Sequence, residues 1–381
     1  MKHKILLPLL LCLLGILSFP ANAAEASTDV TKVPPGFGEV LDALPEELRD
    51  TLPPELFSEE IEELERGVHS LGSVSYLLRT TLSLLGITLD ECLALLATLL
   101  GLLLLSAVAN AARQTIGNEA VGRAFSFVSS LVLLLLLVRE GWRSIESVAT
   151  YFSRLNAISA ALLPLTGTLY AVGGNLGAAT ASTAGLSIYL TVLEEVVGKS
   201  ILPFCGVCVS LSLIGALDPA PRVGALVGTI KKNYTTLLAF LMMILNTALA
   251  SQTFLGSKGD SLAMRSARFA AGNLIPVVGG SITELLRSVG VGIGYLRGTV
   301  GICAILLLLL SLLPTILHLY LVRLVFQLSA SVGELLGCVG EGRLLGEFAS
   351  LAGYLIAAAL ICSSVMTVSL LLFVRCAAAF A

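Results

Sequence analysis

Long apolar segments, separated by short polar ones, make up most of this chain after residue 91. The first covers residues 92–109, and its portion 99–105 is nearly all leucine. A helix needs about 20 mainly apolar residues to cross the hydrocarbon core of a bilayer. The pattern predicts an all-α, polytopic helical membrane protein with a multi-helix transmembrane domain over residues 92–381. The further predicted spans are 125–138, 157–172, 176–197, 201–217, 234–255, 299–321 and 348–374.

The span count depends on residues 157–197, which are rich in small side chains. Two spans are predicted there, hinged at Gly173-Gly174-Asn175. They could instead form one re-entrant unit, so the expected total is about seven or eight transmembrane helices.

Residues 139–155 differ from their apolar surroundings. Apolar side chains recur there at helical spacing, with charged ones off the stripe: Trp142, Ile145, Val148, Ala149, Phe152 and Leu155. This pattern predicts an amphipathic helix lying in the membrane interface, with Trp142 at headgroup level. The alternative is an ordinary surface helix packed on the bundle.

The N-terminus is typical of a signal peptide. Lys2, His3 and Lys4 precede an apolar run over residues 5–19, and Ala21-Asn22-Ala23 fits a cleavage site. Residues 1–23 are therefore expected to be a cleavable signal peptide, with an uncleaved anchor helix as the alternative. Both interpretations put the following segment outside the cytoplasmic membrane.

Residues 24–91 form the only substantial polar region. Half of the chain's 26 acidic residues lie between Glu25 and Arg66, where only three basic residues oppose them. Prolines followed by glutamates favour helix starts, so short acidic extracytoplasmic helices are expected in this leader. Two roles stay open for it: a docking surface for a partner, or a solvated segment repelled by anionic lipid.

The composition excludes several functions. Hydrophobic residues make up 56% and charged residues 13% of the chain, against about 25% charged in a soluble domain. No basic patch interleaves with aromatics, so nucleic-acid binding is not expected. Nucleotide-binding and metalloprotease motifs are absent from the sequence, and Cys205-x-x-Cys208 has no second pair to make a zinc site. We expect no enzyme activity, no metal and no cofactor.

The stretch from Ser266 to Gly280 contains three glycines, a proline and an asparagine. Backbone groups in lipid must be satisfied internally, so residues 266–281 are either a surface loop or a broken helix lining a cavity. The residues expected to form a polar path or a packing motif there are Arg265, Arg268, Asn273, Pro276, Gly279, Gly280 and Glu284.

A similar Pro/Gly pattern occurs earlier, where residues 163–167 resemble 275–279. Transporters often carry such breaks at equivalent places in internal repeats. The residues of the candidate matching break are Pro164, Gly167, Gly173, Gly174 and Asn175. Proline and glycine are also common in membrane helices without any repeat, so both interpretations stay open.

The segment from Arg268 to Gly280, behind a signal peptide and an acidic leader, resembles the stage III sporulation protein AE family of endospore-forming Firmicutes. The core from Asn273 to Gly280 is its most specific part. The resemblance implies a multi-pass protein of the outer forespore membrane, in a sporulation-specific mother cell–forespore channel or secretion-like complex. It also implies a permease-like or gate-like role and partners that include ring-forming and ATPase components. A non-conducting assembly scaffold and a general small-solute transporter are the alternatives.

Overall fold

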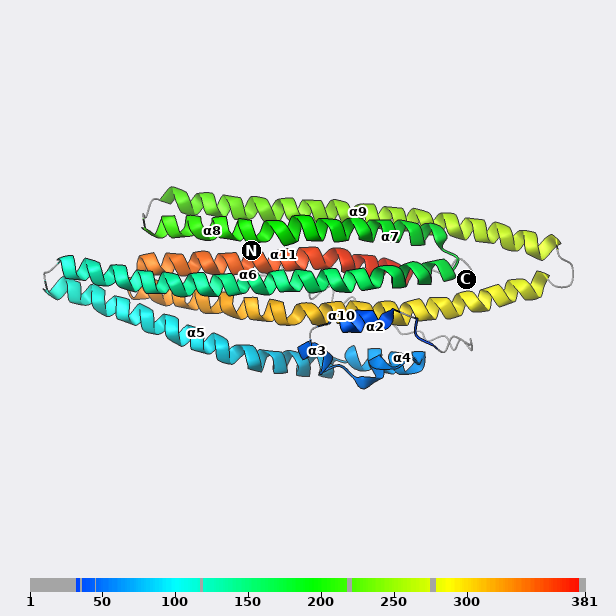
Figure 1. The fold of residues 1–381 in the computed structure, drawn as a ribbon, viewed down its shortest axis with the longest axis horizontal. Helices are drawn as coiled ribbons and strands as arrows, with labels where there is room; N and C mark the ends of the chain where they lie inside the picture. Colours follow the sequence, from blue (N-terminus) through cyan, green and yellow to red (C-terminus); the bar gives the residue numbers. More distant parts are fainter. Residues whose placement is uncertain are drawn as a thin grey trace.

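The computed structural model describes residues 32–34, 36–44, 46–116, 119–217, 221–274 and 279–376. Long helices in this part of the chain lie side by side as an elongated bundle (Figure 1). Their bounds are α5 Val74–Ile116, α6 Glu119–Val172, α7 Leu176–Val192, α8 Lys199–Leu217, α9 Pro221–Leu274, α10 Gly279–Leu335 and α11 Val339–Arg375. A π-helical segment, Leu193–Gly198, joins α7 to α8 in one nearly continuous rod. The predicted all-α class is confirmed for the described residues.

Five of these helices contain a segment that is long and apolar enough to cross a membrane. The segments are Thr88–Ala111, Leu131–Val172, Leu226–Ser266, Val291–Leu335 and Val339–Arg375. The predicted total of seven or eight spans is therefore not confirmed. The predicted signal peptide, residues 1–23, lies outside the described residues.

Helix α6 shows why the predicted span boundaries fail. It runs without interruption through 54 residues, which corresponds to about 81 Å at 1.5 Å per residue. The predicted spans 125–138 and 157–172 both belong to it, together with residues 139–155. The predicted interfacial helix is thus wrong as a separate element. Its apolar stripe faces the bundle, with Ile145, Val148 and Phe152 buried, whereas Trp142 is 56% exposed.

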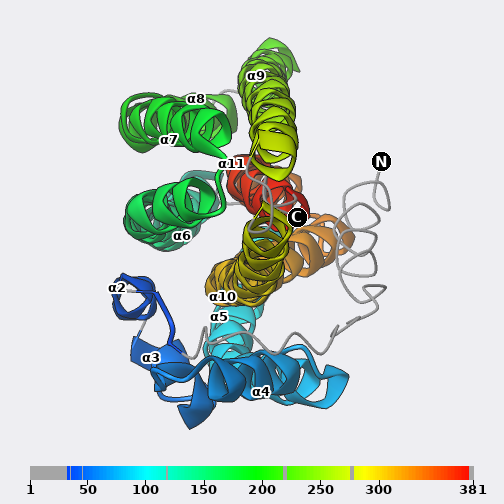
Figure 2. The same ribbon diagram turned by 90° about the vertical axis from the view of Figure 1, so that its right-hand side faces the viewer.

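The centre of the bundle is the antiparallel pair α10–α11. Seen end-on, α11 lies in the middle, with α6, α7, α9 and α10 around it (Figure 2). Large aliphatic and aromatic side chains of this pair are almost fully buried, among them Leu307, Leu308, Met366 and Phe373. Burying such side chains and packing them at high density stabilises the bundle interior.

The leader folds into short helices against one side of the bundle. They are α2 Phe37–Asp42, α3 Glu46–Arg49, the 3₁₀ helix Pro54–Phe57 and α4 Ile61–Leu71. Leu48, Leu56 and Leu64 are buried in the same core as residues of α6 and α10. The hydroxyl of Tyr295 on α10 also donates a hydrogen bond to the Glu65 carboxylate. The leader is therefore seated on the bundle, which the sequence pattern alone did not show.

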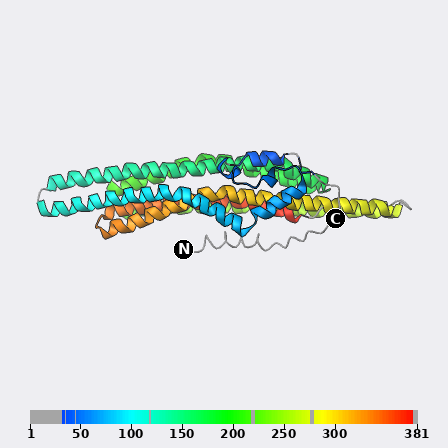
Figure 3. The same cartoon turned by 90° about the horizontal axis from the view of Figure 1, so that it is seen from below.

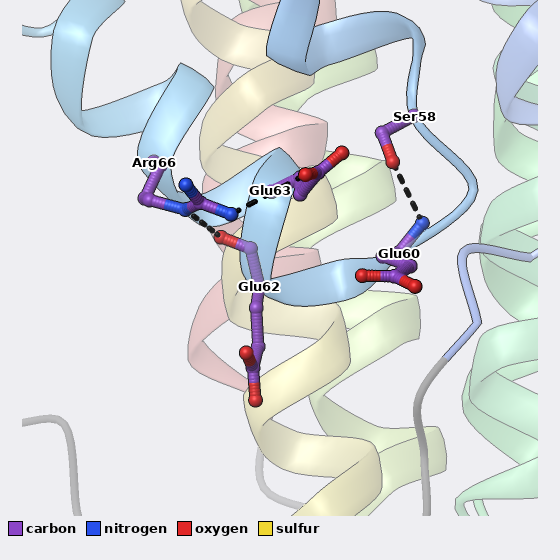
Figure 4. Close-up of polar contacts among 5 residues, drawn as sticks. All are labelled: Ser58, Glu60, Glu62, Glu63 and Arg66. Carbon is purple, nitrogen blue, oxygen red and sulfur yellow. Dashed lines mark hydrogen bonds and ion pairs between the residues drawn. The ribbon is translucent and has the colours of Figure 1, made fainter.

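Helix α4 begins at Ile61, directly after Glu60, which makes no side-chain cap bond. The Ser58 hydroxyl accepts a hydrogen bond of 3.1 Å from the Glu60 backbone N–H (Figure 4). Acidic side chains Glu62 and Glu63 lie in the first turn, where the positive end of the helix dipole favours them. Arg66 donates to the Glu62 carbonyl and to the Glu63 carboxylate, each at 3.4 Å.

Candidate functional site

The glycine-rich stretch of residues 266–281, called the motif below, connects α9 to α10. Helix α9 ends at Leu274 and α10 begins at Gly279. Both helices extend past the α6–α7 turn at this end of the molecule (Figures 1 and 3). The motif therefore connects two antiparallel helices at an end of the bundle. Its predicted role as a surface loop or as a broken helix lining a cavity stays a prediction.

The predicted motif residues divide between these helices. The backbones of Arg265, Arg268 and Asn273 belong to α9, and those of Gly279, Gly280 and Glu284 to α10. Arg265 is exposed. Pro276 lies outside the described residues, and among these residues only the side chain of Arg265 is described.

The predicted matching break is wrong at its first two residues. Pro164 and Gly167 lie inside α6, which continues to Val172. Proline removes only one intrahelical donor, and neighbouring helices and side chains can compensate for that loss in membrane proteins. Residues 163–167 therefore lie inside one helix, whereas residues 275–279 lie where α9 is connected to α10. This difference does not support the internal repeat.

Gly173, Gly174 and Asn175 do form the predicted turn, between α6 and α7. The N–H of Asn175 bonds the Tyr170 carbonyl at 2.9 Å, and that of Gly174 bonds the Ala171 carbonyl at 3.0 Å. Gly174 has a φ of 76°, which glycine adopts without steric cost. Together these features make a Schellman motif, which satisfies carbonyls at the end of α6.

Helix α7 receives its N-terminal cap from another helix. Asn175 makes no side-chain cap bond. Instead the Asp260 carboxylate of α9 accepts hydrogen bonds from the N–H groups of Gly177 (2.9 Å) and Ala178 (3.0 Å). A carboxylate there satisfies two otherwise unpaired donors and favours the positive end of the helix dipole.

Replacing Asp260 by alanine is expected to lower the free energy of unfolding by about 1–2 kcal/mol, because both cap bonds are lost. Equilibrium unfolding in mixed micelles, followed by helix content, measures this change. Ser261→Ala is the matched control, since the Ser261 hydroxyl donates to the Lys258 carbonyl of its own helix. Equal stability of the two variants would contradict a role for Asp260 as the cap.

Arg297 of α10 lies under the same turn and is 0% exposed. Its Nη1 donates to the Cys376 carbonyl at 2.9 Å, and its guanidinium carbon lies 5.2 Å from the centroid of the Tyr170 ring. A Cβ atom on Gly173 would lie 2.5 Å from Nη2, so a larger residue there would displace the guanidinium from its present position. The Cys376 thiol in turn lies 3.0 Å from the Ser257 hydroxyl.

These contacts define a turn cluster in which the ends of α6, α7 and α11 meet the interior of α9 and α10. Its members are Tyr170, Gly173, Asn175, Ser257, Asp260, Arg297 and Cys376. Sequence reasoning found only Gly173 and Asn175 among them. A charged residue next to a long apolar segment is a functional signal in membrane proteins, and it could have identified Arg297.

A second buried polar contact joins α9 to α11 near the N-terminal end of each helix. Lys231 of α9, only 1% exposed, places its Nζ 2.9 Å from Glu347 Oε2 and 3.2 Å from the Glu347 carbonyl on α11. Cys205 and Cys208 of α8 are buried in the core. In the described part of the chain, no group of three or more metal-ligating side chains is assembled.

Comparison with known proteins shows to which protein family the chain belongs. A family model described as stage III sporulation protein AE matches residues 56–381, which include the later part of the leader and the whole bundle. The chain belongs to the stage III sporulation protein AE family. This confirms the resemblance carried by residues 268–280, and the membrane-capable helices agree with a membrane component in a sporulation context.

A stage III sporulation protein AE from Bacillus subtilis (strain 168) is 22% identical to this chain over 244 residues. The aligned region covers 64% of this chain and 61% of that relative, so it spans less than two thirds of the relative's length. No solved structure matches the chain.

Proposed function

We propose that this chain is a permease-like or gate-like membrane subunit of a sporulation-specific complex between mother cell and forespore. The observation that carries the proposal is the family match, which includes the whole helical bundle. Five membrane-capable helices support a location in the membrane. The proposed site is the outer forespore membrane, with the leader in the intermembrane space next to ring-forming partners. Any ATPase component would be a separate protein.

The packing of the bundle bears on where a path would run. The α10–α11 centre is filled by Leu307, Leu308, Met366 and Phe373, all almost fully buried. A path through the middle of one bundle would require these side chains to separate. The proposal therefore places the path at the outer surface, where the α9–α10 connection meets a second subunit or a partner.

Single-cysteine labelling along residues 273–281 tests this placement. In a cysteine-free background, the full chain in liposomes is exposed to a membrane-impermeant maleimide. Continuous or periodic labelling of these positions is expected if the connection faces water. Exposed Ser266→Cys serves as a positive control, and a restored Cys303, which is 0% exposed, as a negative one. No labelling from either side of a folded, inserted protein would overturn the path.

The alternative is a non-conducting scaffold, and the seated leader favours it. The leader is docked through buried leucines and the Tyr295–Glu65 bond, while Glu59, Glu60 and Glu62 stay exposed. A bulky substitution in the α9–α10 connection distinguishes a gate from a scaffold. In a gate, Gly280→Trp should lower spore yield while the complex still co-purifies. In a scaffold, spore yield should fall only where co-purification falls.

A further inference from the structure

Within the described residues, one edge of the Arg297 guanidinium makes no hydrogen bond. Nε and Nη2 are buried and make no hydrogen bond in the described part of the chain, whereas Nη1 bonds the Cys376 carbonyl. In arginine, Nε and Nη2 point the same way and present two parallel N–H groups. This is the edge that binds two oxygens of a carboxylate or a phosphate.

A second unpaired donor comes from another helix. The Tyr170 hydroxyl is buried and has no hydrogen-bond partner among the described residues, and the Tyr170 ring lies under the same guanidinium. Tyr170, like Arg297, is 0% exposed. Two neighbouring buried side chains with free donors and no acceptor indicate a missing acceptor, because each such group loses its bonds to water on folding.

The charge of Arg297 also has no acidic partner among the described residues. Asp260, the acid of the turn cluster, uses both carboxylate oxygens on the Gly177 and Ala178 N–H groups. No ion pair joins Arg297 to an acid in the described part of the chain. Burying an unpaired cation is strongly unfavourable. A water molecule would satisfy a donor but would leave the charge unopposed.

We propose that Arg297 and Tyr170 form a binding site for one oxyanion, a carboxylate or a phosphate group. The two oxygens face Nε and Nη2, and the Tyr170 hydroxyl donates to one of them. Gly173 leaves the guanidinium in place, since a Cβ there would lie 2.5 Å from Nη2. The position beside the apolar segment 299–321 suits either a lipid phosphate or a free anion. The site does not depend on whether the protein conducts.

Thermal unfolding of the full chain, followed by circular dichroism, tests the site. The protein in zwitterionic nanodiscs is compared in phosphate or formate and in chloride at equal ionic strength. A second arm adds phosphatidylglycerol to the nanodiscs. At saturating oxyanion the midpoint should rise by on the order of 5 °C relative to chloride. A rise in the first arm identifies a free anion, and a rise only with phosphatidylglycerol identifies a lipid headgroup.

The decisive variant is Arg297→Lys, which keeps the charge but lacks the two-nitrogen edge. Its oxyanion-dependent shift should disappear. Arg323→Lys, on the same helix with its guanidinium packed against Gly353, should shift like the wild type. If Arg297→Lys does not fold, Tyr170→Phe keeps the ring and should weaken oxyanion binding severalfold. Equal shifts in all variants, or no shift beyond chloride in either arm, would overturn the site.

Discussion

Replacing Glu347 by glutamine is expected to lower the free energy of unfolding by about 3–5 kcal/mol, because it leaves a buried cation without its counterion. The Lys231 ammonium is 1% exposed, and both of its hydrogen bonds go to Glu347. The carbonyl bond alone cannot balance the charge. Unfolding in mixed micelles, measured as in the Asp260 experiment, gives the difference.

The two halves of this ion pair should not be equivalent. The Glu347 side chain is 29% exposed, so after Lys231→Met its carboxylate can still bind water. Lys231→Met should therefore lose less stability than Glu347→Gln. The double variant Lys231→Met/Glu347→Leu should recover most of the loss, since an apolar pair of similar volume can replace a buried ion pair.

Lys232→Met is the matched control, because Lys232 is the exposed neighbour of Lys231 on the same helix. Its effect should stay within about 0.5 kcal/mol. A Glu347→Gln variant as stable as Lys232→Met would show that α9 and α11 are not held together by this pair.

The position of the helices along the chain could be predicted from the apolar pattern, but their lengths could not. The polar residues 139–155 suggested a change of environment between two spans. In the structure Arg143 of this segment pairs with Glu91 of α5 at 2.8 Å, on the surface of one continuous helix. Such a pairing depends on the antiparallel neighbour of α6, which local sequence does not reveal.

In the turn cluster too, local sequence predicts the turn itself but not the contacts made with distant helices. The sequence predicts a hinge at Gly173, Gly174 and Asn175 between two spans, and in the structure Gly174 takes the left-handed conformation that ends α6. Asp260 was missed because its two hydrogen bonds go to residues 82 and 83 positions away. The leader helices were likewise expected, whereas their seat on α10 through Tyr295 and Glu65 requires the folded arrangement.

Replacing Gly256 by alanine is expected to lower the free energy of unfolding by about 2 kcal/mol, because helices α7 and α9 touch through their backbones there. A Cβ on Gly256 would lie 2.7 Å from both the carbonyl carbon and the carbonyl oxygen of Gly177. Backbone atoms cannot move aside as a flexible side chain can, so α7 must shift away from α9.

Gly259 of the same helix supplies the control, since a Cβ there would meet nothing within 4 Å. Gly259→Ala should stabilise the protein by up to about 1 kcal/mol through helix propensity, which acts equally at both positions. Opposite changes in the free energy of unfolding for Gly256→Ala and Gly259→Ala would show the effect of the contact between α7 and α9 alone. A shift of α7 would also break the Asp260 cap, so Gly256→Ala and Asp260→Ala should lose less stability together than the sum of their separate losses. Stabilisation by Gly256→Ala, or full additivity with Asp260→Ala, would mean that the α7–α9 contact does not position the cap.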